Sequence, residues 1–169
     1  MRLLVTGGAG FIGSNLVDEL VRQKHQVLII DNLSGGKKEN VNSKAKFYLA
    51  DVTNLKQIKP IFRGVDYVFH LAALPRVQFS IEHPMESDAV NVRGMLNVLV
   101  ASANAGVKKV IYSASSSAYG DQKTMPLRES FLATPKSPYG LQKYIGELYC
   151  KTWSEVYGLP TVCLRYFNV

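Results

Sequence analysis

The feature that most constrains the fold is a glycine-rich segment at residues 7–13, between a short apolar run and a helical pattern. Gly8, Gly10 and Gly13 have the spacing G-x-G-x-x-G, and Gly7 with the last two gives a looser G-x-x-G-x-x-G. The preceding run, Leu3–Thr6, is typical of a buried parallel strand. The apolar positions that follow recur at helical spacing; they are Ile12, Leu16, Val17, Leu20 and Val21. A glycine loop between a strand and a helix is the setting of a dinucleotide-binding turn.

Glycines at such a turn let the backbone approach a pyrophosphate, which accepts hydrogen bonds at the positive end of the helix. A second apolar run, Gln26–Ile30, ends at Asp31, 18 residues after Gly13. An acid at this distance binds the adenosine ribose and favours NAD over NADP. Lys37 and Lys38 follow and leave NADP open. The alternative is a glycine-rich turn beside an exposed aspartate.

Apolar strand patterns alternate with helical patterns along the whole chain. The expected strands are 3–6, 26–30, 47–50, 67–71, 109–112 and 161–166, and the expected helices are 11–24, 55–62, 88–105 and 138–157. Segments 75–84 and 113–137 are expected to be loops. This alternation predicts an α/β fold, a doubly wound parallel (Rossmann) sheet with helices on both faces. Ligands of such sheets bind beyond the carboxyl ends of the strands.

Composition narrows the class of protein further. The length of 169 residues suits one domain, and no apolar run is long enough to cross a membrane. Cys150 and Cys163 lack metal-ligand spacing, so they are expected to be core thiols of a cytoplasmic protein with no metal site. The net charge of +7 raises the question of nucleic-acid binding. Because its lysines are scattered among acidic and apolar residues, solvated faces are favoured over a nucleic-acid partner.

A tyrosine and a lysine four residues apart, Tyr139 and Lys143, share one face of the expected last helix. A lysine beside a phenol stabilises the phenolate, so the pKa of Tyr139 is expected to lie below the usual value of about 10. Tyr139 is then a candidate base near neutral pH. The alternative is a chance spacing on an amphipathic helix.

Taken in order, the motifs resemble the extended short-chain dehydrogenase/reductase family, in particular its NAD-dependent UDP-hexose 4-epimerases. The resemblance extends from Met1 to Val169. Its motifs are Thr6–Gly13, Asp31–Leu33, Asp51–Val52, Leu71–Ala73, Asn91–Gly94, Tyr112–Gly120, Tyr139-x-x-x-Lys143 and Arg165–Asn168.

The resemblance implies NAD as cofactor and a role for each matching position. The implied cofactor-binding residues are Gly7, Gly10, Phe11, Ile12 and Gly13 at the pyrophosphate; Asp31, Asn32, Leu33, Ser34, Gly35 and Gly36 around the adenosine ribose; Asp51 and Val52 at the adenine; Leu71, Ala72 and Ala73 along the central part; and Tyr139, Lys143 and Phe167 toward the nicotinamide. Asn91 and Ser113 are also implied to bind the cofactor.

The resemblance also implies the chemistry. Tyr139 would take the proton of a sugar 4-hydroxyl while C4 gives hydride to NAD, and a transient 4-keto sugar would take the hydride back on its other face. Lys143 would keep Tyr139 ionised, and Ser115 would hold the 4-hydroxyl. The implied substrate contacts are Ser115, Ser117, Tyr139 and Asn168.

The two residues after Ser115 separate the reactions within this family. Related 4,6-dehydratases have Asp-Glu there, and related decarboxylases usually keep a glutamate. Ser116 and Ser117 cannot do that proton transfer, so epimerisation is favoured over elimination. Another epimerase, dehydratase or decarboxylase of the family remains an alternative, as does a non-catalytic NAD-binding module. The sugar of the UDP-sugar substrate stays open between glucose, N-acetylated and uronate forms.

Members of this family are about twice as long as 169 residues. The chain is therefore expected to be the N-terminal NAD-binding domain, residues 1–169, of a two-domain enzyme whose substrate domain is missing here. A homodimer is expected through helices 88–105 and 138–157, with Met95 and Leu99 forming an apolar stripe on the first of these.

Overall fold

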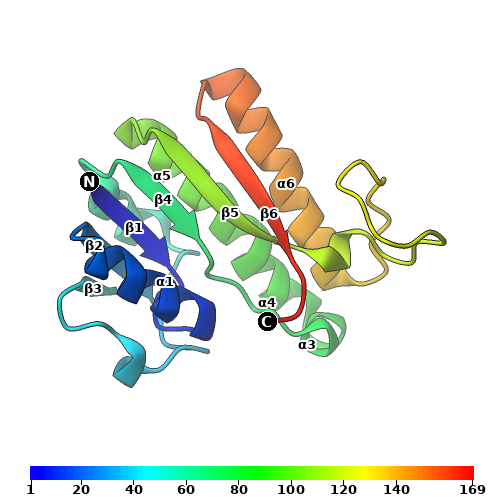
Figure 1. Cartoon of the computed structure of the whole chain (residues 1–169), viewed down its shortest axis with the longest axis horizontal. Helices are drawn as coiled ribbons and strands as arrows, with labels where there is room; N and C mark the ends of the chain where they lie inside the picture. Colours follow the sequence, from blue (N-terminus) through cyan, green and yellow to red (C-terminus); the bar gives the residue numbers. More distant parts are fainter.

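The computed structural model describes all 169 residues and contains one parallel sheet with helices on both faces (Figure 1). The strands are β1 Arg2–Thr6, β2 Gln26–Asp31, β3 Lys46–Leu49, β4 Tyr67–His70, β5 Lys109–Ser115 and β6 Thr161–Tyr166. The α-helices are α1 Phe11–Arg22, α2 Leu55–Ile58, α3 Val77–Glu82, α4 Pro84–Asp88, α5 Met95–Ala105 and α6 Pro138–Tyr157. Shorter helical turns are η1 Lys38–Asn40, η2 Lys59–Phe62, η3 Ala89–Gly94 and η4 Ser116–Ala118.

The strand order is β3-β2-β1-β4-β5-β6, and every neighbouring pair is parallel. The chain runs outward from β1 in one direction and then continues from β4 in the other. The order therefore reverses between β1 and β4, where doubly wound sheets bind their ligands. The predicted fold class is confirmed.

Alternate residues of the central strands enter two separate cores. On β1, Leu4 packs into the larger core under α5 and α6, whereas Leu3 and Val5 pack against α1. On β2, Leu28 packs into the larger core and Val27 packs into the core under α1. Because both faces of these strands are covered, their sequences are continuous apolar runs rather than alternating ones.

The expected loop at 75–84 is wrong, since α3 occupies residues 77–82 and α4 begins at Pro84. The expected helix 88–105 also differs: it begins with α4, passes through a π-helical turn at Ala89–Gly94, and continues as α5. Pro84 is tolerated because it occupies the first turn of a helix, where its missing N–H has no partner to lose.

The apolar stripe expected at Met95 and Leu99 lies in the core and not on the surface, since both side chains are fully buried. On α5 the half-buried apolar side chains are neighbours such as Leu96 and Val100. No helix of the structure is long and apolar enough to span a bilayer.

Candidate functional site

A cavity of about 520 Å³ lies at the carboxyl ends of the strands, and most of the predicted site residues line it. The predicted residues among its lining are Gly7, Gly10, Phe11, Ile12, Gly13, Asp31, Asn32, Ser34, Gly35, Gly36, Val52, Leu71, Ala72, Ala73, Ser113, Ser115, Ser117, Tyr139, Lys143, Phe167 and Asn168. The glycine loop and the Tyr139–Lys143 pair, more than 100 residues apart in sequence, therefore share one cavity.

Close packing around the glycine loop explains why glycine occupies positions 7 and 13. A Cβ on Gly13 would collide with the carbonyl oxygen of Gly7. Gly7 has φ +73°, and a Cβ there would lie 2.7 Å from the backbone nitrogen of Ala72. The turn thus brings β1, α1 and the segment after β4 together in a way that side chains would prevent. Helix α1 begins at Phe11 with neither a side-chain cap nor an acid in its first turn. Its first N–H groups are therefore suited to a phosphate, so the loop fits a dinucleotide.

Asp31 lies at the end of β2, is 8% exposed, and lines the cavity. Its carboxylate accepts hydrogen bonds from the backbone nitrogen of Ala9, at 3.0 Å, and of Leu33, at 2.8 Å. Asp31 thus ties the glycine loop to the loop after β2. The sequence predicted an acid for a ribose, and the structure adds this anchoring role.

Three predicted cofactor residues do not line the cavity: Leu33, Asp51 and Asn91. Leu33 continues the turn after Asp31 with φ 61°. Asp51 accepts from the backbone nitrogen of Thr53 and from the amide of Asn32, both at 2.8 Å, so it orients the cavity residue Asn32. A motif match locates a segment but does not show which way each side chain points.

Asn91 is buried in the π-helical turn η3 and holds the segment after β4. Its Oδ1 accepts from the backbone nitrogen of Leu74 at 2.8 Å, and its Nδ2 donates to the carbonyl of Leu74 at 3.1 Å. Nδ2 also lies 2.9 Å from Oε1 of Gln142 on α6. These bonds fix a cavity wall against α6, and cofactor binding by Asn91 stays a prediction.

Ser115, Tyr139 and Lys143 converge on the cavity from β5 and α6, and all three are buried. Ser115 accepts a hydrogen bond from the backbone nitrogen of Ser117 at 3.1 Å, which leaves its hydroxyl proton free to donate elsewhere. Lys143 Nζ donates to the carbonyl of Ser113 at 2.8 Å and lies 6.0 Å from the centroid of the Tyr139 ring. Ser137 caps α6 and Pro138 occupies its first turn, so the helix begins directly at the site.

The expected lowering of the Tyr139 pKa is wrong for the chain by itself. Burial raises the pKa of the phenol above 10, and the interaction with the Ser115 hydroxyl only partly offsets this. Burial also lowers the pKa of Lys143 to about 8. Desolvation opposes both charged forms, so it outweighs the attraction that the spacing implies.

Ser80 was missed as a site residue because segment 75–84 looked like a loop. Its fully buried Oγ accepts the backbone N–H of Tyr139 at 3.0 Å and donates to the carbonyl of Val77 at 2.6 Å. Val77 in turn lines the cavity. Helix α3 therefore supports the first turn of α6. The serine is 59 residues from Tyr139, so no local pattern could have revealed the contact.

Comparison with known proteins places this site in context. The NAD dependent epimerase/dehydratase family matches residues 3–169. The UDP-glucose 4-epimerase of Thermotoga maritima, solved with UDP-glucose, superposes with a TM-score of 0.97 at 42% identity, over 99% of this chain and 56% of that one.

Two further solved structures are similarly close. The UDP-N-acetylglucosamine 4-epimerase of Methanobrevibacter ruminantium, in complex with UDP-N-acetylmuramic acid, has a TM-score of 0.94 at 44% identity, over 99% of this chain and 55% of that one. The UDP-glucose 4-epimerase of Thermus thermophilus, in complex with NAD, has a TM-score of 0.94 at 38% identity, over 98% and 55%. The chain spans about half the length of the curated relatives it matches.

Proposed function

The chain belongs to the NAD-dependent epimerase/dehydratase family, and we propose that residues 1–169 form the NAD-binding domain of a UDP-hexose 4-epimerase. One observation carries the proposal: the glycine loop and the Ser115, Tyr139 and Lys143 side chains line the same cavity. The first would hold a dinucleotide, and the others would handle a sugar hydroxyl beside it.

The residues that would hold NAD follow the cavity from end to end. The first turn of α1 suits the pyrophosphate, Asp31 suits the adenosine ribose, and Lys143 and Phe167 suit the nicotinamide end. When bound, NAD supplies a reversible hydride acceptor. The carboxylate of Asp31 repels a 2′-phosphate, which supports NAD over NADP.

The chain's own groups would move the proton. Tyr139 receives the proton of the sugar 4-hydroxyl, and Ser115 donates a hydrogen bond to that oxygen as it becomes a ketone. The ammonium of Lys143 stabilises the phenolate of Tyr139. Burial alone leaves Tyr139 protonated at neutral pH, so a further positive charge in the cavity is needed to ionise it.

The composition of the cavity supports epimerisation over elimination. Ser116 and Ser117 line it at the positions after Ser115, and neither is an acid or base of the strength that removal of water requires. The sugar is proposed to be glucose or an N-acetylated hexosamine, because relatives of both names match, at 42% and 44% identity.

The test is to express the complete gene product, to incubate it with NAD and, separately, with UDP-glucose, UDP-N-acetylglucosamine and UDP-glucuronate, and to separate the products. We expect the 4-epimer of one of them, without net accumulation of NADH. Tyr139→Phe should reduce turnover by about 100- to 10,000-fold, since it removes the proton acceptor. Undiminished turnover in Tyr139→Phe would remove the assigned base. NAD binding without any turnover would favour a non-catalytic module.

A further inference from the structure

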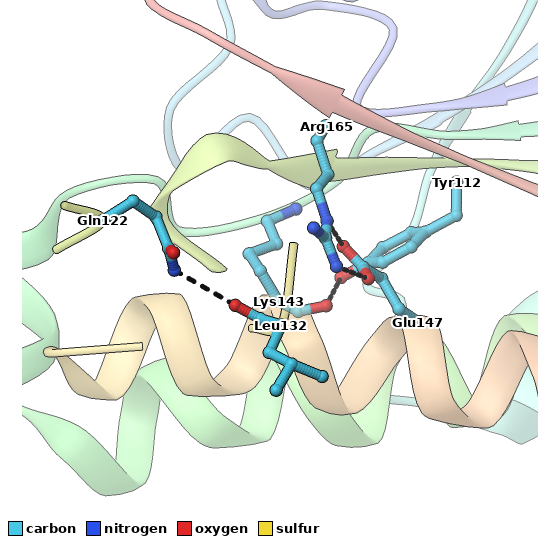
Figure 2. Close-up of polar contacts among 6 residues, drawn as sticks. All are labelled: Tyr112, Gln122, Leu132, Lys143, Glu147 and Arg165. Carbon is cyan, nitrogen blue, oxygen red and sulfur yellow. Dashed lines mark hydrogen bonds and ion pairs between the residues drawn. The ribbon is translucent and has the colours of Figure 1, made fainter. Parts of the chain in front are cut away.

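A partly buried ion pair joins α6 to β6 next to the proposed site. Arg165 donates from Nε to Glu147 Oε1 at 2.8 Å and from Nη2 to Oε2 at 2.7 Å, a two-pronged contact (Figure 2). The two side chains are only 17% and 13% exposed. Such paired hydrogen bonds fix the angle as well as the distance between the partners.

The pair is placed where movement would affect the site. Glu147 lies one helical turn after Lys143 and two after Tyr139, on the same face of α6. Arg165 lies near the end of β6, opposite Ala114 of β5, and two residues before Phe167. The bond therefore ties the helix that carries the proposed base to the strand that leads into the cavity wall.

A third segment meets the pair. The guanidinium of Arg165 lies 4.3 Å from the centroid of the Tyr119 ring. Tyr119 directly follows the turn η4, which begins after Ser115 and contains Ser117. Arg165 thus belongs to the segment that leads to Phe167 and contacts the two segments that supply Ser115 and Tyr139.

Near Glu147, α6 packs so closely against β5 that the helix has little room to shift. A Cβ on Gly146 would lie 2.6 Å from Cζ of Tyr112. The hydroxyl of Tyr112 also lies 3.5 Å from the carbonyl oxygen of Lys143 (Figure 2). A small shift of the helix would therefore change this contact and move Lys143.

Net stability is a poor explanation for the pair. Removing two charges even partly from water offsets much of their attraction, so an ion pair of this kind contributes little to folding on balance. In addition, Nη1 of Arg165 is buried without a hydrogen-bond partner, which is itself unfavourable. The pair does fix the position of α6 relative to β6.

We infer that Arg165 and Glu147 are positioning residues that set where Lys143 and Tyr139 stand relative to Ser115. This inference rests on the proposed function, because only an active site gives the position of Lys143 a consequence for catalysis. The pKa of Lys143, which depends on that position, can nevertheless be measured without any turnover. Lys143 is 3% exposed, and it faces Tyr139 of its own helix, Tyr112 of β5 and His70 of β4.

The test is an NMR titration of the Lys143 side chain in the 169-residue protein, assigned with Lys143→Arg. In Glu147→Gln the unpaired Arg165 cation would, by charge alone, lower the pKa of Lys143 further. Loss of position would instead admit water and raise this pKa from about 8 toward 10.5. We expect the rise in Glu147→Gln and also in Arg165→Lys, which keeps the charge but loses the fork.

A Lys143 pKa that stays near 8 or falls in Glu147→Gln overturns the inference, whether or not the protein turns over a UDP-sugar. The control is Arg22→Met, which breaks the exposed pair with Glu19 on α1 and should leave Lys143 unchanged. Where epimerase activity is measured, Glu147→Gln should lower kcat by about 100-fold with little change in KM. If the Lys143 pKa rises as expected but no UDP-sugar is turned over, the result supports the positioning role and counts against the proposed function.

Discussion

At the scale of single residues, burial decides what Tyr139 and Lys143 can do. Their spacing suggests an ion pair, yet the structure holds both in surroundings that favour the uncharged forms. His70 shows the same effect more strongly. It is 1% exposed, its Nδ1 lies 2.7 Å from the hydroxyl of Thr6, and burial lowers its pKa to about 3.

The phenol of Tyr139 should titrate above pH 10 in the protein without nucleotide, because its burial raises the pKa. Ultraviolet difference spectra of the wild type and Tyr139→Phe, recorded across the alkaline range, isolate its ionisation. A midpoint below pH 10 in the absence of NAD would show that the attraction of Lys143 outweighs desolvation after all.

His70 should make the fold sensitive to acid. Its folded pKa of about 3 lies below the ordinary value of 6.5, so the unfolded chain binds a proton first as the pH falls. Stability is then lost between pH 6.5 and pH 3, by about 2 kcal/mol from pH 7 to pH 5. Urea unfolding at both pH values should show this loss in the wild type but not in His70→Gln.

The matched control for His70 is the exposed His83. His83→Gln should keep the acid sensitivity of the wild type. An equal pH dependence in His70→Gln and the wild type would mean that other groups cause it.

At the scale of elements, the turn between β1 and α1 depends on the absence of side chains. Gly13→Ala would press a methyl group against the carbonyl of Gly7, whereas a Cβ on Gly35, another cavity residue, meets nothing within 4 Å. We expect Gly13→Ala to weaken NAD binding by about 10- to 100-fold, because overpacking of this size costs about 1–3 kcal/mol.

Isothermal titration of both alanine variants with NAD checks this expectation. Gly35→Ala should bind NAD nearly as the wild type does. Equal losses in the two variants would show that the loop responds to any added methyl group rather than to the collision at Gly13.

The predicted bounds of a helix agree with the structure where capping residues and a helical apolar pattern indicate the same ends. Helix α6 was predicted at 138–157 and is found there, because Pro138 and Gly158 mark its ends and the turns between them carry a consistent buried face. The loop predicted at 75–84 was wrong, and the helix predicted from residue 88 begins earlier and contains a π-helical turn. The helices of segment 75–94 depend on buried contacts such as Ser80 with Tyr139 and Asn91 with Leu74. Those contacts join residues too far apart for any local pattern.

At the scale of the whole molecule, the outer face of α6 remains partly apolar. Leu141 and Leu148, two turns apart on the helix, are 48% and 47% exposed. With the half-buried Leu96 and Val100 of α5, they are the surface through which we propose a homodimer. This apolar surface is what association with a second copy would bury.

Leu148→Arg should therefore convert a dimer to a monomer, because burying an unpaired charge in the interface is costly. Sedimentation equilibrium measures the change. The control is Leu49→Arg, on the opposite edge strand β3 and 63% exposed. A wild-type protein that is monomeric at high concentration, or a dimer that tolerates Leu148→Arg, would contradict the proposal.

The sequence by itself determined the fold class, a doubly wound parallel sheet, and most of the residues that line the cavity. Apolar runs alternating with helical patterns can bury their faces only as a doubly wound sheet, and its strands end at one edge. That edge gathers Gly13, Asp31, Ser115 and Tyr139 whatever their distance in sequence. Only the tertiary structure decided what each side chain does there. Asn91 and Asp51 turn from the cavity to hold its walls, and the pKa of Tyr139 rises. Orientation and desolvation depend on neighbours from other elements, which a motif does not contain.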